Sequence, residues 1–208
     1  MAVIISGIKL PFEAGQGEAI RQAERVARAE PGSVPARVMR QSYDLRHGRL
    51  SRVWSVELAL NPRAEAALLR GGSPHIRPAP DDSMPVSTGT HKLAGPPVII
   101  GLGPAGLFAA LVLAENGYRP HILERGQAIG ARDAAVARFS AGGVLDSESN
   151  IQFGEGGAGT YSDGKLTTRI GSPECALVLR LLARYGAPEE ALIAAKPHIG
   201  TDLLKGIV

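Results

Sequence analysis

The hydrophobic residues of the first seventy positions recur with two spacings, one typical of strands and the other typical of a helix. Trp54, Val56 and Leu58 alternate with polar residues, which indicates a strand with one buried face. Between residues 18 and 29 the apolar side chains instead recur at helical spacing, and the dipeptide at 31–32, Pro-Gly, ends that helix. We therefore predict a small α/β domain over residues 1–70 with the order βαββ, half of a ferredoxin-like fold. Its strands are expected at 3–8, 36–44 and 50–60, its first helix at 18–29, and a short further helix at 61–70.

The periodic pattern stops at residue 71. From 71 to 96 the chain is rich in Pro, Gly, Ser and Asp and shows no apolar period, which is typical of a linker. We place the domain boundary there and expect a second domain over residues 97–208.

An apolar run at 98–100 leads into Gly-Leu-Gly-Pro-Ala-Gly, and this order predicts a strand, a turn and a helix. The first glycine permits a sharp turn, the second lets a pyrophosphate approach the backbone, and the third lets the helix pack closely on the strand. Proline suits the first helical turn, whose free N–H groups and partial positive charge attract phosphate. The residues expected at the pyrophosphate are Gly101, Gly103, Pro104, Ala105 and Gly106.

A second strand is predicted at 121–123, and Glu124 follows it. A carboxylate about 20 residues beyond such glycines accepts hydrogen bonds from ribose hydroxyls, and its charge would repel a 2′-phosphate. The alternative is a tight strand-to-helix turn that binds no ligand. The glycine run does not by itself separate FAD from NAD.

A second glycine-rich segment spans residues 150–169. Its five glycines between 154 and 164 rule out an ordinary helix interior. Phe153, Tyr161 and Leu166 are side chains that a solvated linker does not need. We therefore expect a loop that embraces a ligand.

Several of these stretches resemble the bacterial FAD-dependent dehydrogenases, also described as NAD(P)/FAD-dependent oxidoreductases, that carry an extra N-terminal α/β domain. The matching segments are 101–110, 124–126, 149–169 and 196–202, with a Ser-x-Asp-x-Arg segment within 41–46. The long segment 149–169 is the most specific of them.

The resemblance implies FAD at the glycine site of an incomplete Rossmann-like domain of the glutathione-reductase type, with NAD(P)H as an electron donor in the full-length protein. Gly101, Gly103 and Gly106 would hold the pyrophosphate, and Glu124 the adenosine ribose. Because only two parallel strands are evident, we expect an N-terminal portion of such a protein. The further cofactor-binding residues expected on this basis are Arg125, Arg132, Gly156, Gly157, Gly159, Thr160 and Lys165.

No residue is assigned a catalytic role. Lys165 could stabilise negative charge on a reduced flavin, contact a phosphate or simply be solvated. Arg132 could contact a phosphate or lie on the surface. His198 is an acid or base candidate, or else a structural residue that caps the following helix. No Cys or His cluster has metal-ligand spacing.

Composition narrows these alternatives. The single cysteine, Cys175, excludes an internal disulfide and the cysteine pair of flavin disulfide reductases, and it fits a cytoplasmic protein. We expect no secretory signal and no membrane span. The net charge is only +3, and the arginines at 21–52 are interspersed with acidic residues. Neither feature favours binding of nucleic acid. A flavin-dependent RNA-modifying protein and a non-catalytic nucleotide-binding fragment remain as alternatives to an oxidoreductase of undefined substrate and oligomeric state.

Overall fold

A computed structural model describes residues 2–80, 89–162, 164–166, 168, 170 and 172–208. These residues form two compact units. The first unit is drawn from 1–84, 167–183 and 188–197, and the second from 85–166, 184–187 and 198–208. The protein is mixed α/β, with an antiparallel sheet in the first unit and a parallel pair of strands in the second. Among the described residues, no helix is long and apolar enough to cross a membrane.

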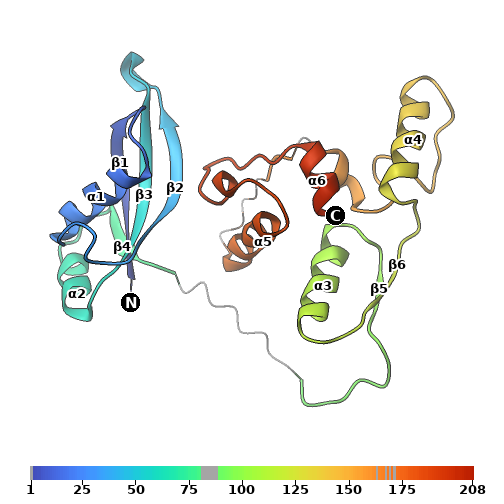
Figure 1. The fold of residues 1–208 in the computed structure, drawn as a ribbon, viewed down its shortest axis with the longest axis horizontal. Helices are drawn as coiled ribbons and strands as arrows, with labels where there is room; N and C mark the ends of the chain where they lie inside the picture. Colours follow the sequence, from blue (N-terminus) through green and yellow to red (C-terminus); the bar gives the residue numbers. More distant parts are fainter. Residues whose placement is uncertain (1, 81–88, 163, 167, 169, 171) are drawn as a thin grey trace. The chain divides into compact units, whose positions relative to one another are not determined.

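Within residues 2–80, the first unit contains a four-stranded antiparallel sheet with two helices (Figure 1). The strands lie in the order β2-β3-β1-β4, so that β1 and β3 are central. The sequence prediction of three strands and two helices is confirmed, with ends that differ by up to three residues. The elements are β1 (Ala2–Pro11), α1 (Gln16–Ala27), β2 (Ala36–Asp44), the 3₁₀ turn η1 (Arg46–Gly48), β3 (Ser51–Ala59), α2 (Pro62–Arg70) and β4 (Ile76–Pro78).

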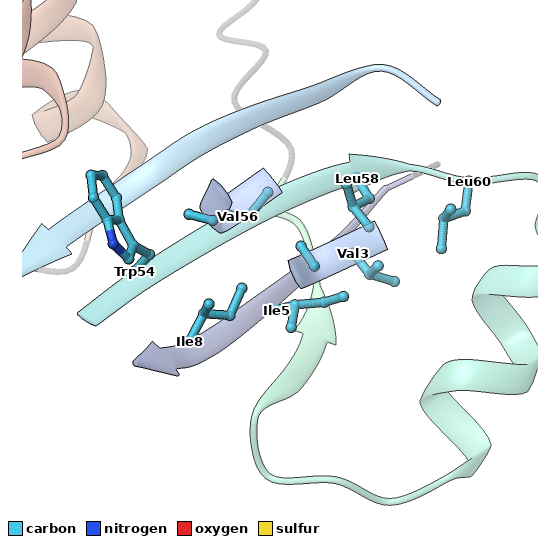
Figure 2. Close-up of a cluster of buried hydrophobic side chains, with 9 residues drawn as sticks. Val3, Ile5, Ile8, Trp54, Val56, Leu58 and Leu60 are labelled. Atoms are coloured by element: carbon cyan, nitrogen blue, oxygen red, sulfur yellow. The ribbon is translucent and has the colours of Figure 1, made fainter. Parts of the chain in front are cut away.

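The core of this unit lies on one face of the sheet (Figure 2). Alternate residues of β3 point into it, as the sequence pattern predicts. In β1 the alternation shifts by one position at a bulge where Gly7 adopts φ +73°. The shift keeps Ile8 on the same face as Ile5. The buried hydrophobic residues of this core are Val3, Ile5, Ile8, Ala19, Ala23, Trp54, Val56, Leu58 and Leu60.

The prediction that residues 71–96 form a linker is partly wrong, because β4 lies within this range. The three residues of β4 pair with β1, and Ile76 lies opposite Ile5. An edge strand tolerates proline because one side of it needs no donor. A three-residue strand between prolines carries too few positions to show a period. The sheet therefore extends to Pro78, beyond the boundary predicted at residue 70.

The second unit contains the predicted strand-turn-helix-strand. Strands β5 (Val98–Ile100) and β6 (His121–Leu123) pair in parallel, and α3 (Pro104–Glu115) connects them. The remaining elements are α4 (Ile129–Ser140), the 3₁₀ turn η2 (Gly157–Tyr161) and α6 (Thr201–Ile207).

Part of the chain beyond residue 166 belongs to the first unit. These residues include most of α5 (Pro173–Arg184) and the 3₁₀ turn η3 (Glu189–Leu192). After η3 the chain pairs in parallel with the outer edge of β2. Gln41 N–H donates to the Ile193 carbonyl at 2.6 Å, and Ala195 N–H donates to the Gln41 carbonyl at 2.9 Å. Residues 188–197, which we expected in the second domain, thus cover an exposed sheet edge of the first unit.

Candidate functional site

The glycine turn after β5 has the geometry expected of the sequence 101–106. Gly101 adopts φ +92°, and its N–H donates to the Leu123 carbonyl at 2.7 Å, which ties the turn to β6. A Cβ atom on Gly106 would lie 2.0 Å from the Gly101 carbonyl oxygen. Only glycine therefore allows α3 to pack this closely on the turn.

The N-terminus of α3 presents donors at this turn. Gly103 is the N-cap, and as a glycine it has no side chain that could accept a hydrogen bond from the first N–H groups of the helix. Pro104 has no N–H, and the N–H groups of Ala105 and Gly106 lie in the first turn, where no carbonyl of the helix can accept from them. A phosphate group fits this end of the helix in charge and in hydrogen bonding.

Glu124 is held at the end of β6 by backbone donors. Leu102 N–H donates to Oε2 at 2.6 Å and Gly126 N–H donates to Oε1 at 2.8 Å. Burial by itself raises the pKa of the Glu124 carboxyl, but these backbone hydrogen bonds stabilise the carboxylate more, so the pKa lies below its ordinary value.

A cavity of about 510 Å³ joins the glycine turn to Glu124. Its volume is in the range of small-molecule sites. Five of the predicted site residues line it, and five further residues complete the wall. The predicted members are Gly101, Gly103, Glu124, Arg125 and Gly157, and the others are Ile100, Leu123, Gln152, Phe153 and Gly154.

Arg125 and Phe153 form a stacked pair on this wall. The Arg125 guanidinium carbon lies 4.2 Å from the centroid of the Phe153 ring, and Arg125 Nε lies 3.0 Å from Oε2 of Glu148. The sequence indicates that Phe153 does not belong to a solvated linker, but local spacing does not predict that Phe153 or Gln152 lies at this site. Their position next to the first glycine of the loop was the available signal.

The glycine-rich loop packs directly on the glycine turn. Gly156 N–H donates to the Leu102 carbonyl at 2.8 Å. A Cβ atom on Gly157, which adopts φ +63°, would lie 3.0 Å from the Gly103 Cα. A Cβ atom on Gly159 would lie 3.5 Å from Cγ of Pro104, which is an ordinary contact distance. The two glycine segments are thus brought together, as expected of a loop at a ligand site.

Arg132 holds this loop from within, so its predicted surface position is wrong, whereas its predicted contact with a phosphate stays a prediction. Its side chain is fully buried. The guanidinium donates to four backbone carbonyls of the loop at 2.5–2.9 Å. Periodicity could not identify this role, because the acceptors lie 18–25 residues away along the chain. The four acceptors are the carbonyl oxygens of Asn150, Ile151, Glu155 and Gly157.

Tyr161 closes the loop against two helices. Its hydroxyl donates to Oδ1 of Asp133 at 2.6 Å, and Lys205 of α6 donates to the same oxygen at 2.7 Å. Burial and then the hydrogen bond to Asp133 raise the pKa of Tyr161 to about 12. Thr160, predicted at the cofactor, is also buried and donates its hydroxyl to the Glu155 carbonyl at 3.2 Å. Both residues therefore stabilise the loop.

Lys165 and His198 are outside the cavity wall. They are exposed, and their backbones form an isolated antiparallel bridge. Helix α6 begins after Gly200 without a side-chain cap, so the expectation that His198 caps it is wrong. Thr201 instead donates its hydroxyl to the Ser162 carbonyl at 2.6 Å. Among the described residues, no group of three or more His, Cys, Asp or Glu is placed to hold a metal ion.

Comparison with known proteins finds a relative that is similar over part of the chain. No family model matches this chain. An uncharacterized protein of Clostridium beijerinckii is 52% identical over 123 residues, which make up 59% of this chain and 23% of that protein. The match thus covers less than a quarter of the length of the curated relative.

Proposed function

We propose that this chain binds FAD and forms the dinucleotide-binding part of a flavin-dependent oxidoreductase. The observation that carries the proposal is the shared cavity of the glycine turn and Glu124, built on a parallel βαβ unit. We infer that this unit is an incomplete Rossmann-like domain of the glutathione-reductase type. We also infer that the first unit is ferredoxin-like, because its βαββαβ order and its 2-3-1-4 strand order suit that fold.

The residues present suit the ADP half of such a cofactor. The bare backbone at Gly103 and the N–H groups of Ala105 and Gly106 would hold the pyrophosphate, and Glu124 would accept hydrogen bonds from the ribose hydroxyls. Glu124 also disfavours a 2′-phosphate by charge repulsion. Arg132 would act as a positioning residue, since it orders the loop that carries Gly156 and Gly157. When bound, FAD would supply the electron-accepting ring system.

The surface of α3 and its strands supports the inference of an incomplete domain. Helix α3 is apolar on all sides and yet has no buried residue. Ile100 and Leu123, on β5 and β6, are exposed. Parallel strands and all-round apolar helices are normally covered on both sides. Further strands and helices of a doubly wound domain would cover these groups.

The test is an absorption spectrum of the purified chain before and after incubation with FAD and desalting, followed by chromatography of any cofactor released on denaturation. We expect flavin bands with FAD, and none with FMN, which lacks the AMP group and therefore both the pyrophosphate and the adenosine ribose. Binding of FAD that is equal in the wild-type chain and in a Gly103→Asp variant would overturn the proposed site.

The same sample separates the alternatives. Reduction of bound flavin by NADH or NADPH would support the oxidoreductase. Bound FAD that no donor reduces would favour a non-catalytic nucleotide-binding chain. Salt-sensitive binding of RNA by the flavin-loaded chain would favour the RNA-modifying alternative.

A further inference from the structure

Helix α6 is too short to be stable by itself. It has seven residues and begins after Gly200 without a side-chain cap. Isolated helices of this length are unstable in water, so the helical state of α6 depends on what it packs against. Within the second unit it lies along η2 of the glycine-rich loop (Figure 1), and its buried residue is Leu204.

Contacts at both ends of α6 fix it to this loop. At its start, the Thr201 hydroxyl donates to the Ser162 carbonyl at 2.6 Å. After its last residue, Val208 lies close to the bare backbone of Gly156, because a Cβ atom on Gly156 would be 3.2 Å from Cγ2 of Val208. The helix therefore spans the loop from residue 162 back to residue 156.

Lys205 makes the central contact. Its ammonium group donates to Oδ1 of Asp133 at 2.7 Å, the same oxygen that accepts from the Tyr161 hydroxyl at 2.6 Å. The Lys205 nitrogen also lies 5.0 Å from the centroid of the Tyr161 ring, within the range of a cation–π contact. The hydrogen bonds from Lys205 first and then from Tyr161 keep the pKa of Asp133 below its ordinary value, so this carboxylate is charged at neutral pH. We call Asp133, Tyr161 and Lys205 the α6 clasp.

The clasp reaches the cavity only through the loop. The residues of α6 are not among the described residues that line the cavity. Gly156 donates its N–H to the Leu102 carbonyl at 2.8 Å, and Gly157 forms part of the cavity wall. A docked α6 thus holds the loop from one side, and a ligand in the cavity would contact it from the other. Two groups that favour the same loop conformation strengthen each other's binding.

We propose that α6 regulates the cofactor site: its docking on the loop raises the affinity of the cavity for FAD, and FAD in the cavity stabilises docked α6. The choice of FAD as the ligand rests on the proposed function, whereas the hold of α6 on the loop does not. The coupling is a free energy shared by the two events, so its factor is the same in both directions. Lys205 acts through the loop and is therefore a positioning residue.

The first measurement needs no ligand. Hydrogen exchange of the Gly156 amide is followed by NMR in the ligand-free wild type and in Lys205→Met, which removes the central contact. We expect exchange to be about fivefold faster in the variant, because an undocked α6 lets the loop leave the Leu102 carbonyl more often. Lys205→Arg keeps a cationic donor and should return the rate to within about twofold of the wild type. Lys92→Met removes the same charge at an exposed position of the second unit and should leave the rate unchanged.

The second measurement uses FAD. Its affinity, from the change in flavin fluorescence, should be about fivefold lower in Lys205→Met than in the wild type and unchanged in Lys92→Met. In the wild type, saturating FAD should slow exchange of the Val208 amide, which donates to the Leu204 carbonyl at 3.2 Å. A contact that only stabilised the fold would leave this exchange independent of FAD.

Three outcomes would contradict the regulation by α6. Equal exchange of the Gly156 amide in Lys205→Met and in the wild type overturns it, with or without FAD. Equal FAD affinity of the two chains, or Val208 exchange that FAD does not slow, also overturns it but leaves the proposed function intact. A wild-type chain that binds no FAD overturns both the proposed function and its regulation, and the first measurement then shows separately whether α6 holds the loop.

Discussion

At the scale of single residues, the site depends on positions where a side chain is absent or fully buried. Gly106 is an example of the absent side chain, and Arg132 is an example of the fully buried one. The first is required because a Cβ atom has no room, and the second because its guanidinium fills the interior of a loop that has few side chains of its own.

Gly106→Ala should destabilise the second unit by about 2 kcal/mol and abolish FAD retention, because its Cβ would meet the Gly101 carbonyl oxygen at 2.0 Å. Gly130→Ala is the matched control, since α4 leaves open space at that position. The control should be neutral or stabilising by about 0.5 kcal/mol. Urea unfolding followed by circular dichroism measures both, and equal stability of the two variants would contradict the packing argument.

Arg132→Met should release the glycine-rich loop. Four carbonyl groups would lose a charged donor, at an expected loss of about 3 kcal/mol or more. Hydrogen exchange of the amides at 150–157 should accelerate, and the FAD bands should be lost after desalting. Arg138→Met, at an exposed position of the same helix, should change neither measurement.

Glu124 makes stability depend on pH in a defined direction. Because its pKa in the folded chain lies below the ordinary value of 4.5, its stabilising effect is fully present above about pH 4.5 and is lost as pH falls through the lowered pKa. Glu124→Gln should therefore be less stable than the wild type at pH 7, and the difference should shrink below pH 4.5. Unfolding curves from pH 3 to 7 test this, and an equal difference between Glu124→Gln and the wild type at every pH would contradict it.

At the scale of elements, the edges of the first unit's sheet are closed by short segments distant in sequence. Strand β4 closes one edge, and residues 193–195 cover part of the other. Ile193 packs against the core of this unit, whereas the neighbouring Leu192 is exposed.

Ile193→Asp should detach the segment that covers β2. Burial of an unpaired carboxylate is unfavourable, so the segment should leave the edge and the Gln41 amide should lose its acceptor. Hydrogen exchange of the Gln41 amide should then be at least tenfold faster than in the wild type. Leu192→Asp serves as the control, and similar exchange rates in the two variants would show that Ile193 does not anchor the segment.

At the scale of the whole molecule, the two units differ in how much apolar surface they bury. Most of the buried hydrophobic residues belong to the first unit, while the second unit contributes Ala135, Ala187, Ile199 and Leu204. Stability increases with buried apolar area, so the two units should unfold separately.

Urea should produce two transitions in the circular dichroism of the chain. Trp54 lies in the core of the first unit and should report only the later transition. FAD should raise the midpoint of the earlier transition alone, because a ligand stabilises the unit that binds it. A single transition that coincides in fluorescence and circular dichroism would instead show that the units unfold together.

The sequence predicted the elements that have a strong local signal. Neighbouring positions carry this signal. The alternation in β3 and the helical period of α1 indicate which face is buried, and the run 98–106 indicates which residues the turn requires. Local sequence therefore suffices to predict that the glycine turn and Glu124 lie close together, and Leu102 N–H does donate to the Glu124 carboxylate.

Only the tertiary structure decided what meets across long stretches of chain. Strand β4 and the segment at 193–195 are too short to show a period, and pairing to a distant strand defines them. The burial of Arg132 cannot be predicted from local spacing, because its acceptors come from a loop 18–25 residues further along the chain. Local spacing determines which side chains face inward, whereas the partners they meet there are determined by the packing of the complete fold.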